Sequence, residues 1–283
     1  MSNLRIGIPS KGRLADHATE LLRQAGLNFR RQDRTLFART KEMPVEITFL
    51  RTDDIPTLCA EGAIDLGVTG SDLVAESGAE VDVRLPLGVG RCRLALCVPE
   101  ESSVDKPEDL AGMRVATSFP HVTKEFFDQT NTETHLVSLS GSVEIMISLN
   151  VADAIVDLVE TGSTLAANKL RILTDIGNYE TVVIQNQKRV SAELADRVIR
   201  RLEGVVIARS YSLLEYNLPR SMLAEAEKIT PGFDSPTINP LEDPDWCAVK
   251  VMVKRNDVIT TMEQLETLGA SAILETQITN CRR

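Results

Sequence analysis

A strand, a turn rich in glycine and hydroxyl groups, and a helix follow one another over residues 153–168, and this unit constrains the fold most. The apolar run Ala154–Val159 is interrupted only by Asp157, as in a buried strand with a carboxylate near its C-terminal end. The turn 160–164 then precedes the helix-forming segment 165–170. Buried strands followed by helices predict an α/β fold, whose ligands bind beyond the carboxyl ends of the strands.

The turn 160–164 has the composition of a phosphate-binding loop: Glu160, Thr161, Gly162, Ser163 and Thr164. Free backbone N–H groups and the positive end of a helix dipole attract phosphate there. Asp157, at the end of the strand, is spaced to accept hydrogen bonds from the hydroxyls of a phosphorylated sugar. The alternative is an ordinary connection in which Ser and Thr cap the helix and Asp157 is solvated.

A second unit of this kind occurs at residues 63–77. The predicted strand Ala63–Val68 is followed by the turn Thr69-Gly-Ser-Asp72 and by a helix over 73–77. Asp72 has two open interpretations, a helix cap or an acceptor for the ribose or amino group of a ligand. Repetition of the unit supports a sheet whose strand ends carry polar loops.

Two other loops follow predicted strands. Lys11-Gly-Arg13 follows the strand 4–8, where cations could meet phosphates or stabilise a leaving group, or form a solvated loop. Ser118 and Phe119 precede a helix over 122–128. They could belong to a nucleotide pocket or to a simple helix cap.

The charge balance limits the possible partners. The chain has 283 residues, a net charge of −10 and a pI near 5.0, which argues against nucleic acid. Its five cysteines are scattered and its histidines number three, so neither a disulfide framework nor a zinc site is predicted. No apolar run reaches membrane-spanning length and no signal segment is apparent, so we expect a cytoplasmic protein that does not bind membranes.

The central unit resembles the signature of the ATP phosphoribosyltransferase family, the first enzymes of histidine biosynthesis. Lys11-Gly-Arg13 matches the family as well. Asn150 and Lys169 depart from it, since both stand where that family commonly has Gly. Asn tolerates a left-handed backbone better than other non-glycine residues, so a tight turn remains possible at 150. The signature positions are Glu144, Ala152, Ile155, Asp157, Thr161, Gly162, Thr164 and Leu165.

The resemblance implies a two-lobed α/β catalytic part similar to type II periplasmic binding proteins. Residues 213–278 independently predict a β-α-β-β-α-β order, which is ferredoxin-like and typical of a small regulatory domain. The strands 171–174 and 181–184 are interpreted as the return of the chain to the first lobe. We therefore expect lobe I at 1–89 and 180–209, lobe II with the phosphoribosyl-binding loop at 90–179, and a regulatory domain at 210–283.

The implied reaction transfers the phosphoribosyl group of phosphoribosyl pyrophosphate to N1 of ATP, with Mg²⁺ on the pyrophosphate. N1 is already a neutral nucleophile, so positioning and electrostatics must supply most of the catalysis. The catalytic candidates are Lys11, Arg13 and Asp157, and the metal ligands are left unassigned. The substrate-binding candidates are Asp153, Glu160, Thr161, Gly162, Ser163, Thr164, Glu144, Arg51, Asp72, Ser118 and Phe119.

The resemblance also implies histidine as a feedback inhibitor and a homo-oligomer, from dimer to hexamer. The positions that match the histidine pocket of the family are Asn217, Phe233, Ser235, Thr237 and Ala272. The alternative role of this domain is assembly alone, through exposed strand edges.

Two other functions stay open on the sequence. A prephenate dehydratase-like lyase also couples a two-lobed α/β domain to an amino-acid-sensing domain, but its Thr-Arg-Phe-type motif is not found. A non-enzymatic two-lobed solute-binding protein shares the shape but normally carries an export signal.

Overall fold

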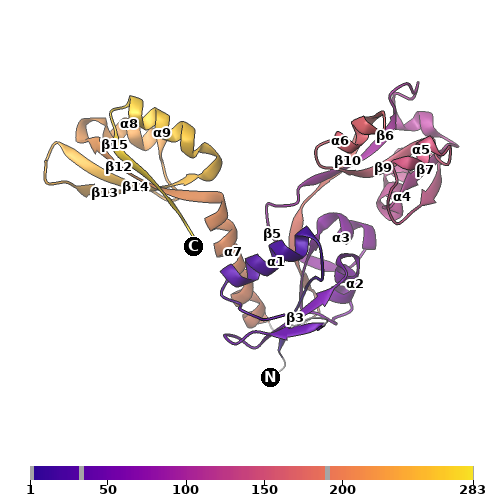
Figure 1. Cartoon of the computed structure of the whole chain (residues 1–283), viewed down its shortest axis with the longest axis horizontal. Coiled ribbons are helices and arrows are strands. Elements are labelled where there is room, and N and C mark those ends of the chain that lie inside the picture. The colour runs from indigo at the N-terminus through magenta and orange to yellow at the C-terminus, as the bar shows by residue number, and fades with distance from the viewer. Residues whose placement is uncertain (1–2, 32–34, 189–191, 283) are drawn as a thin grey trace. The chain divides into compact units, whose positions relative to one another are not determined.

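In a computed structural model, apolar strands form three sheets, and helices connect many of the strands (Figure 1). The structure describes residues 3–31, 35–188 and 192–282. The chain divides into two units, which are described separately below. One comprises Met1–Thr19 and Asn28–Ala195 and contains the first two sheets. The other comprises Glu20–Leu27 and Asp196–Arg283 and contains the third.

The first sheet has parallel strands at its centre, in the order β2-β3-β1-β4-β11-β5. β1 (Leu4–Pro9) pairs in parallel with β3 (Val45–Leu50) and β4 (Leu66–Gly70), and all three are largely buried. Burial on both faces explains why these strands are continuous apolar runs. The remaining elements are α1 (Arg13–Gln24), β2 (Phe37–Arg39), a 3₁₀ turn at Thr52–Asp54, α2 (Ile55–Ala60), α3 (Ser71–Ser77), β5 (Val81–Pro86) and β11 (Thr181–Asn186).

The second sheet has the order β10-β6-β9-β7-β8, so β9 (Ala154–Val159) is its central strand. β9 pairs in parallel with β7 (Arg114–Thr117) and antiparallel with β6 (Cys92–Pro99). Residues 154–156 are fully buried, as the apolar run predicts. The other elements are a 3₁₀ turn at Pro107–Leu110, α4 (Pro120–Gln129), β8 (His135–Ser138), α5 (Ile145–Ser148), α6 (Ser163–Ala167) and β10 (Leu170–Tyr179).

The return of the chain to the first sheet differs from the prediction. The predicted strand 171–174 is part of β10, which pairs with β6 and belongs to the second sheet. Leu170 and Ile172 pack in the core of that sheet, which accounts for its position. Only β11 returns, pairing antiparallel with β4 and β5.

Two helix ends in the second sheet carry left-handed residues. Asn150 follows α5 with φ +55°, and Lys169 follows α6 with φ +52°. Both are the positions where glycine is common in the resembling family, and the left-handed turn at 150 is present with asparagine in place.

The third sheet is antiparallel throughout, in the order β13-β14-β12-β15. Helices α8 and α9 cover one of its faces, where Ala226, Val258 and Leu265 pack against Leu214 and Val249 (Figure 1). The elements are α7 (Ala192–Ser210), β12 (Tyr211–Pro219), a 3₁₀ turn at Arg220–Met222, α8 (Leu223–Ile229), β13 (Thr237–Pro240), β14 (Trp246–Lys254), a 3₁₀ turn at Arg255–Asp257, α9 (Val258–Thr267) and β15 (Ser271–Gln277).

These elements confirm the predicted fold class, two α/β lobes followed by a ferredoxin-like β-α-β-β-α-β domain. Leu194, Val198 and Leu202 recur at helical spacing and predict a helix from Ser191, which is α7, although residue 191 itself lies outside the described part. Within the described ranges, no helix is both long enough and apolar enough to cross a membrane.

Candidate functional site

A cavity of about 360 Å³ lies beyond the C-terminal end of β9. Its wall includes Asp157 and the whole loop 160–164, together with Glu144 from the start of α5. Arg13, at the first residue of α1, also lines it. The structure thus brings together most of the residues that the sequence assigned to a phosphorylated sugar.

The loop 160–164 exposes its hydroxyl groups and does not use them as helix caps. Gly162 is the N-cap of α6 with φ +78°, a conformation that glycine adopts without steric cost, and no side chain caps the helix. The hydroxyl oxygens of Thr161 and Ser163 lie 3.0 Å apart, and both side chains are exposed. The alternative of Ser and Thr as simple caps is therefore not what the loop does.

Asp157 lies within β9 and Asp153 directly before it, and the pKa values of the two carboxyl groups are shifted in opposite directions. Burial raises the pKa of Asp157, the N–H of Leu158 lowers it by donating to Oδ1 at 2.8 Å, and nearby Glu144 raises it. Asp153 lies before the strand and accepts two guanidinium hydrogen bonds from Arg114, which lower its pKa. Asp157 lines the cavity, whereas Asp153 pairs with Arg114 and is not part of the cavity wall.

A second cavity of about 540 Å³ adjoins the first, because Arg13, Cys92, Leu158 and Glu160 line both. Lys11 and Asp72 line it as well, which adds two predicted residues. Several other lining residues carry no motif of their own and could not be predicted from the sequence. These are His17, Thr52, Gly90, Arg91, Cys92 and Thr181.

Asp72 lies in the first turn of helix α3, whose N-cap is Gly70 with no side-chain hydrogen bond. Burial raises the pKa of Asp72, while the backbone N–H groups of Asp72 and Leu73 lower it. A Cβ at position 70 would overlap the Asp72 carboxylate, so glycine permits its position. Asp72 is not the N-cap residue, but its carboxylate interacts with backbone N–H groups of the first turn and also lines the second cavity, so both interpretations stay open.

Three other predicted residues lie outside both cavities. Arg51 is exposed and precedes the 3₁₀ turn whose first residue, Thr52, does line the second cavity. Phe119 is 6% exposed and packs in the core of the second sheet, with its N–H donating to Thr117 Oγ1 at 2.9 Å. Ser118 is half-buried beside it. The turn after β7 is thus part of the core packing.

The residues predicted to bind the inhibitor histidine all lie in the third sheet or in the segment before β13. Asn217 on β12 is paired with Ala248 on one side and Ser271 on the other. The pairing between β12 and β15 contains a bulge, where Ala272 has φ +49°. Phe233 packs edge-to-face on Tyr211 at 5.2 Å between ring centroids, and Ser235 and Thr237 are exposed.

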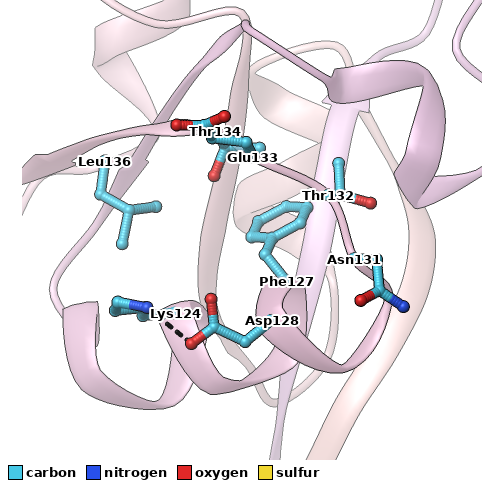
Figure 2. Close-up of a pocket in the computed structure, with 8 residues that line it drawn as sticks. All are labelled: Lys124, Phe127, Asp128, Asn131, Thr132, Glu133, Thr134 and Leu136. Atoms are coloured by element: carbon cyan, nitrogen blue, oxygen red, sulfur yellow. Dashed lines mark hydrogen bonds and ion pairs between the residues drawn. The ribbon is translucent and has the colours of Figure 1, made fainter.

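A further cavity of about 640 Å³ lies between α4 and residues 131–136, and none of the predicted site residues lines it (Figure 2). Its charged side chains are partly paired with each other, since Lys124 Nζ lies 2.6 Å from Asp128. Phe127, which also lines it, belongs to the core. Among the described residues that line the cavity, the one cation, Lys124, is therefore already paired with a carboxylate.

Within the described residues, no group of three or more His, Cys, Asp or Glu side chains could hold a metal ion. A divalent cation bound mainly by substrate phosphates needs only one or two protein carboxylates. Glu144 and Asp157 line the first cavity together and fit that requirement.

Comparison with known proteins identifies the family of this chain. Residues 51–204 match the family model described as ATP phosphoribosyltransferase, and residues 208–280 match that of the HisG C-terminal domain. An ATP phosphoribosyltransferase of Rhodopirellula baltica is 66% identical over 99% of this chain and 94% of its own length. The one from Saccharopolyspora erythraea is 42% identical, over 99% of both chains.

A solved structure is also similar. The ATP phosphoribosyl transferase (HisG:HisZ) complex from Thermotoga maritima contains a chain that is 28% identical, with a TM-score of 0.65. The match covers 72% of this chain and 98% of that one. With matching models over most of its length and such close relatives, the chain belongs to the ATP phosphoribosyltransferase family, whose members catalyse the first step of histidine biosynthesis.

Proposed function

We propose that the two adjoining cavities form the active site in which phosphoribosyl pyrophosphate reacts with ATP. The observation that carries the proposal is the first cavity, where the loop 160–164, Asp157 and Arg13 line one space. A phosphate acceptor, a carboxylate for ribose and a cation for pyrophosphate are the groups that this substrate requires. Because the chain belongs to the ATP phosphoribosyltransferase family, we set aside the two alternatives, a prephenate dehydratase-like lyase and a solute-binding protein.

The loop 160–164 binds the 5′-phosphate in this proposal. Its left-handed Gly162 turns the backbone into the start of α6, and the exposed hydroxyls of Thr161, Ser163 and Thr164 supply donors. Asp157 accepts hydrogen bonds from the ribose hydroxyls as a carboxylate, which fixes the sugar relative to the loop. Its partial burial strengthens these bonds by excluding water.

Lys11 and Arg13 stabilise the departing pyrophosphate. Charge develops on the leaving group while positive charge develops at the ribose C1, so fixed cations on the pyrophosphate side lower the barrier. Arg13 is now paired with Glu160 at 3.4 Å, and binding of pyrophosphate would exchange this carboxylate for a phosphate oxygen. N1 of adenine needs no general base, since it is an unprotonated nucleophile.

ATP occupies the second cavity, with Asp72 as acceptor for a ribose or amino group and Arg51 near its phosphates. Glu144 and Asp157, which line the first cavity together, would hold a Mg²⁺ ion that binds mainly to the pyrophosphate. The bound ion would neutralise negative charge on the leaving group. Arg51 lies next to Thr52, a lining residue, which supports its place at the rim.

The C-terminal domain, residues 210–283, binds histidine and lowers the activity of the two lobes at 1–89 with 180–209 and at 90–179. The ferredoxin-like order of the third sheet supports a sensing role, and its edge strands β13 and β15 offer surfaces for a homo-oligomer. We place the enzyme in the cytoplasm, where ATP is made.

The assignment of the phosphate loop is tested by initial rates at varied substrate concentration. Replacing Thr161 with Val removes a hydroxyl at nearly constant shape, and we expect the KM for phosphoribosyl pyrophosphate to rise about tenfold. The KM for ATP should change less than twofold. Ser138→Ala, on an exposed position at the end of β8, is the control and should change neither. Equal KM values for Thr161→Val and the wild type would contradict the assignment.

The regulatory assignment needs its own variant. Asn217→Leu removes the amide from the candidate histidine pocket on β12, so histidine should lose its inhibition while basal turnover stays within twofold. Thr276→Val on exposed β15 is the control and should keep histidine sensitivity. Unchanged inhibition in Asn217→Leu would move the histidine site elsewhere.

A further inference from the structure

The carboxylate of Glu76, in the last turn of α3, binds the start of α4. The N–H of His121 donates to Oε1 at 3.0 Å, and the N–H of Val122 donates to Oε2 at 3.1 Å. α3 follows β4 of the first sheet, and α4 follows β7 of the second. One side chain of the first lobe therefore makes a two-point contact with the backbone of the second.

Glu76 supplies the cap that α4 lacks in its own sequence. Its N-cap residue, Phe119, makes no side-chain cap, and Pro120 has no N–H to satisfy. The N–H of Thr123 donates to the carbonyl of Phe119 at 3.0 Å. The two remaining donors of the first turn are those of His121 and Val122, and both end on Glu76.

The same helix, α3, lines the second cavity at its other end. Asp72 and Leu73 in its first turn line that cavity, and Leu73 and Ala75 also pack against the core of the second sheet. Seven residues of rigid helix thus link the cavity to the Glu76 contact. A shift of α4 relative to α3 would alter the space between the two lobes.

We propose that Glu76 is a positioning residue, which holds α4 against α3 and keeps the loop 160–164 at its working distance from Lys11 and Arg13. The inference rests on the proposed active site, because the substrate must contact residues of both lobes. Glu76 itself lines neither cavity and touches no reacting atom.

The consequence of losing this contact is specific. If fewer molecules have the lobes correctly spaced, part of the binding free energy of phosphoribosyl pyrophosphate is used to bring them together. The apparent dissociation constant for phosphoribosyl pyrophosphate then equals the intrinsic constant divided by the fraction of molecules with correctly spaced lobes. The saturated complex reacts as before. A merely structural cap would act differently, by lowering the amount of folded enzyme and hence kcat, with KM unchanged.

The test compares Glu76→Gln with Glu125→Gln in the full-length enzyme. Glu125 lies on α4 with its side chain 61% exposed near His121, so its variant removes the same charge without touching the two backbone donors. We expect Glu76→Gln to raise the KM for phosphoribosyl pyrophosphate about three- to tenfold with kcat within twofold. Glu125→Gln should match the wild type in both.

Glu76→Asp extends the test if Glu76→Gln folds poorly, as judged by its thermal transition. The shorter side chain reaches one donor instead of two, so an intermediate KM is expected. An unchanged KM in the folded variant, or a fall in kcat at constant KM, would overturn the proposal. Asp157→Asn, measured alongside, separates failure of the proposed active site from failure of the proposed role of Glu76. Full turnover in Asp157→Asn would reject the active site, whereas the result for Glu76→Gln tests only whether Glu76 sets the spacing of the lobes.

Discussion

The guanidinium of Arg13 lies 3.4 Å from the carboxylate of Glu160, although 147 positions separate them in the chain. Their side chains are 86% and 56% exposed, and exposed pairs of this kind contribute about 0–1 kcal/mol to stability. The pair therefore matters less for folding than for what it places at the cavity, a cation beside the phosphate loop. Arg13 stays paired with Glu160 until a more highly charged anion, such as pyrophosphate, binds to Arg13 in place of Glu160.

Replacing Arg13 with Gln tests this role of the cation. We expect kcat to fall by about 10–100-fold, because a fixed charge on the leaving group is lost. The thermal midpoint should stay within about 1 °C of the wild type, given the exposure of the pair. Arg23→Gln on the same helix, where Arg23 pairs with Glu20, is the control and should retain activity. Full turnover in Arg13→Gln would remove Arg13 from the mechanism.

Substitutions of Asp157, in β9, and of Asp153, directly before it, should separate activity from stability. Asp157→Asn should lower turnover by about 100-fold with little loss of stability, since it removes a half-buried charge that accepts ribose hydroxyls. Asp153→Asn should keep turnover but lower the urea midpoint, because it breaks the two-point contact with Arg114. Activity assays and urea titrations of both proteins provide the comparison, and the reverse pattern would refute the assignment.

The stability deficit of Asp153→Asn should depend on pH. The Arg114 hydrogen bonds lower the pKa of Asp153 below its ordinary 3.8, so the contact stabilises the folded state fully above that pH. Its contribution is lost as pH falls through the lower, folded-state pKa. The difference between the urea midpoints of wild type and variant should therefore shrink in acid. A constant difference down to the lowest pH would mean that Asp153 does not act as a charge.

The acid side of the activity profile should report Asp157. Burial and Glu144 raise its pKa above 3.8, so the ionised form that binds ribose is lost at higher pH than for an ordinary aspartate. Glu144→Gln removes one cause and should shift the acid limb of kcat/KM for phosphoribosyl pyrophosphate to lower pH. An acid limb that stays in place would show that another group controls it.

The fold was largely predictable because burial and periodicity agree along the chain. The run around Asp157 became the central strand of a sheet, and the β-α-β-β-α-β order of the last domain is confirmed. The destination of β10 was not predictable, since an apolar strand such as 171–174 satisfies either sheet equally well. Pairing between strands is decided by tertiary packing, which local pattern does not encode.

The candidate site was predictable where residues follow one another in a motif. The loop 160–164 and Lys11 with Arg13 do so, and they line the cavities. Phe119 and Asp153 have the right residue types near the right strands, but one fills the core and the other pairs with Arg114. The contact of Glu76 could not be predicted, because its two donors lie 45 and 46 positions away and belong to the backbone.

Lys169 offers a test of the backbone strain that the sequence suggested. A non-glycine residue at φ +52° pays for the left-handed conformation, so Lys169→Gly should raise the free energy of unfolding by about 0.5–1 kcal/mol. Asn150→Gly should gain about half of that or less, since asparagine tolerates this region. Lys124→Gly, inside α4, should instead lower the free energy of unfolding by about 1 kcal/mol, because glycine is unfavourable in a helix interior. Chemical denaturation of the three variants decides the order.

The decisive measurement is the release of pyrophosphate from ATP and phosphoribosyl pyrophosphate with Mg²⁺, with wild type and Asp157→Asn assayed side by side. We expect release that requires both substrates in the wild type and falls about 100-fold in the variant, with both proteins folded. Equal release from the two proteins would contradict the assignment of the reaction to the cavity at the end of β9.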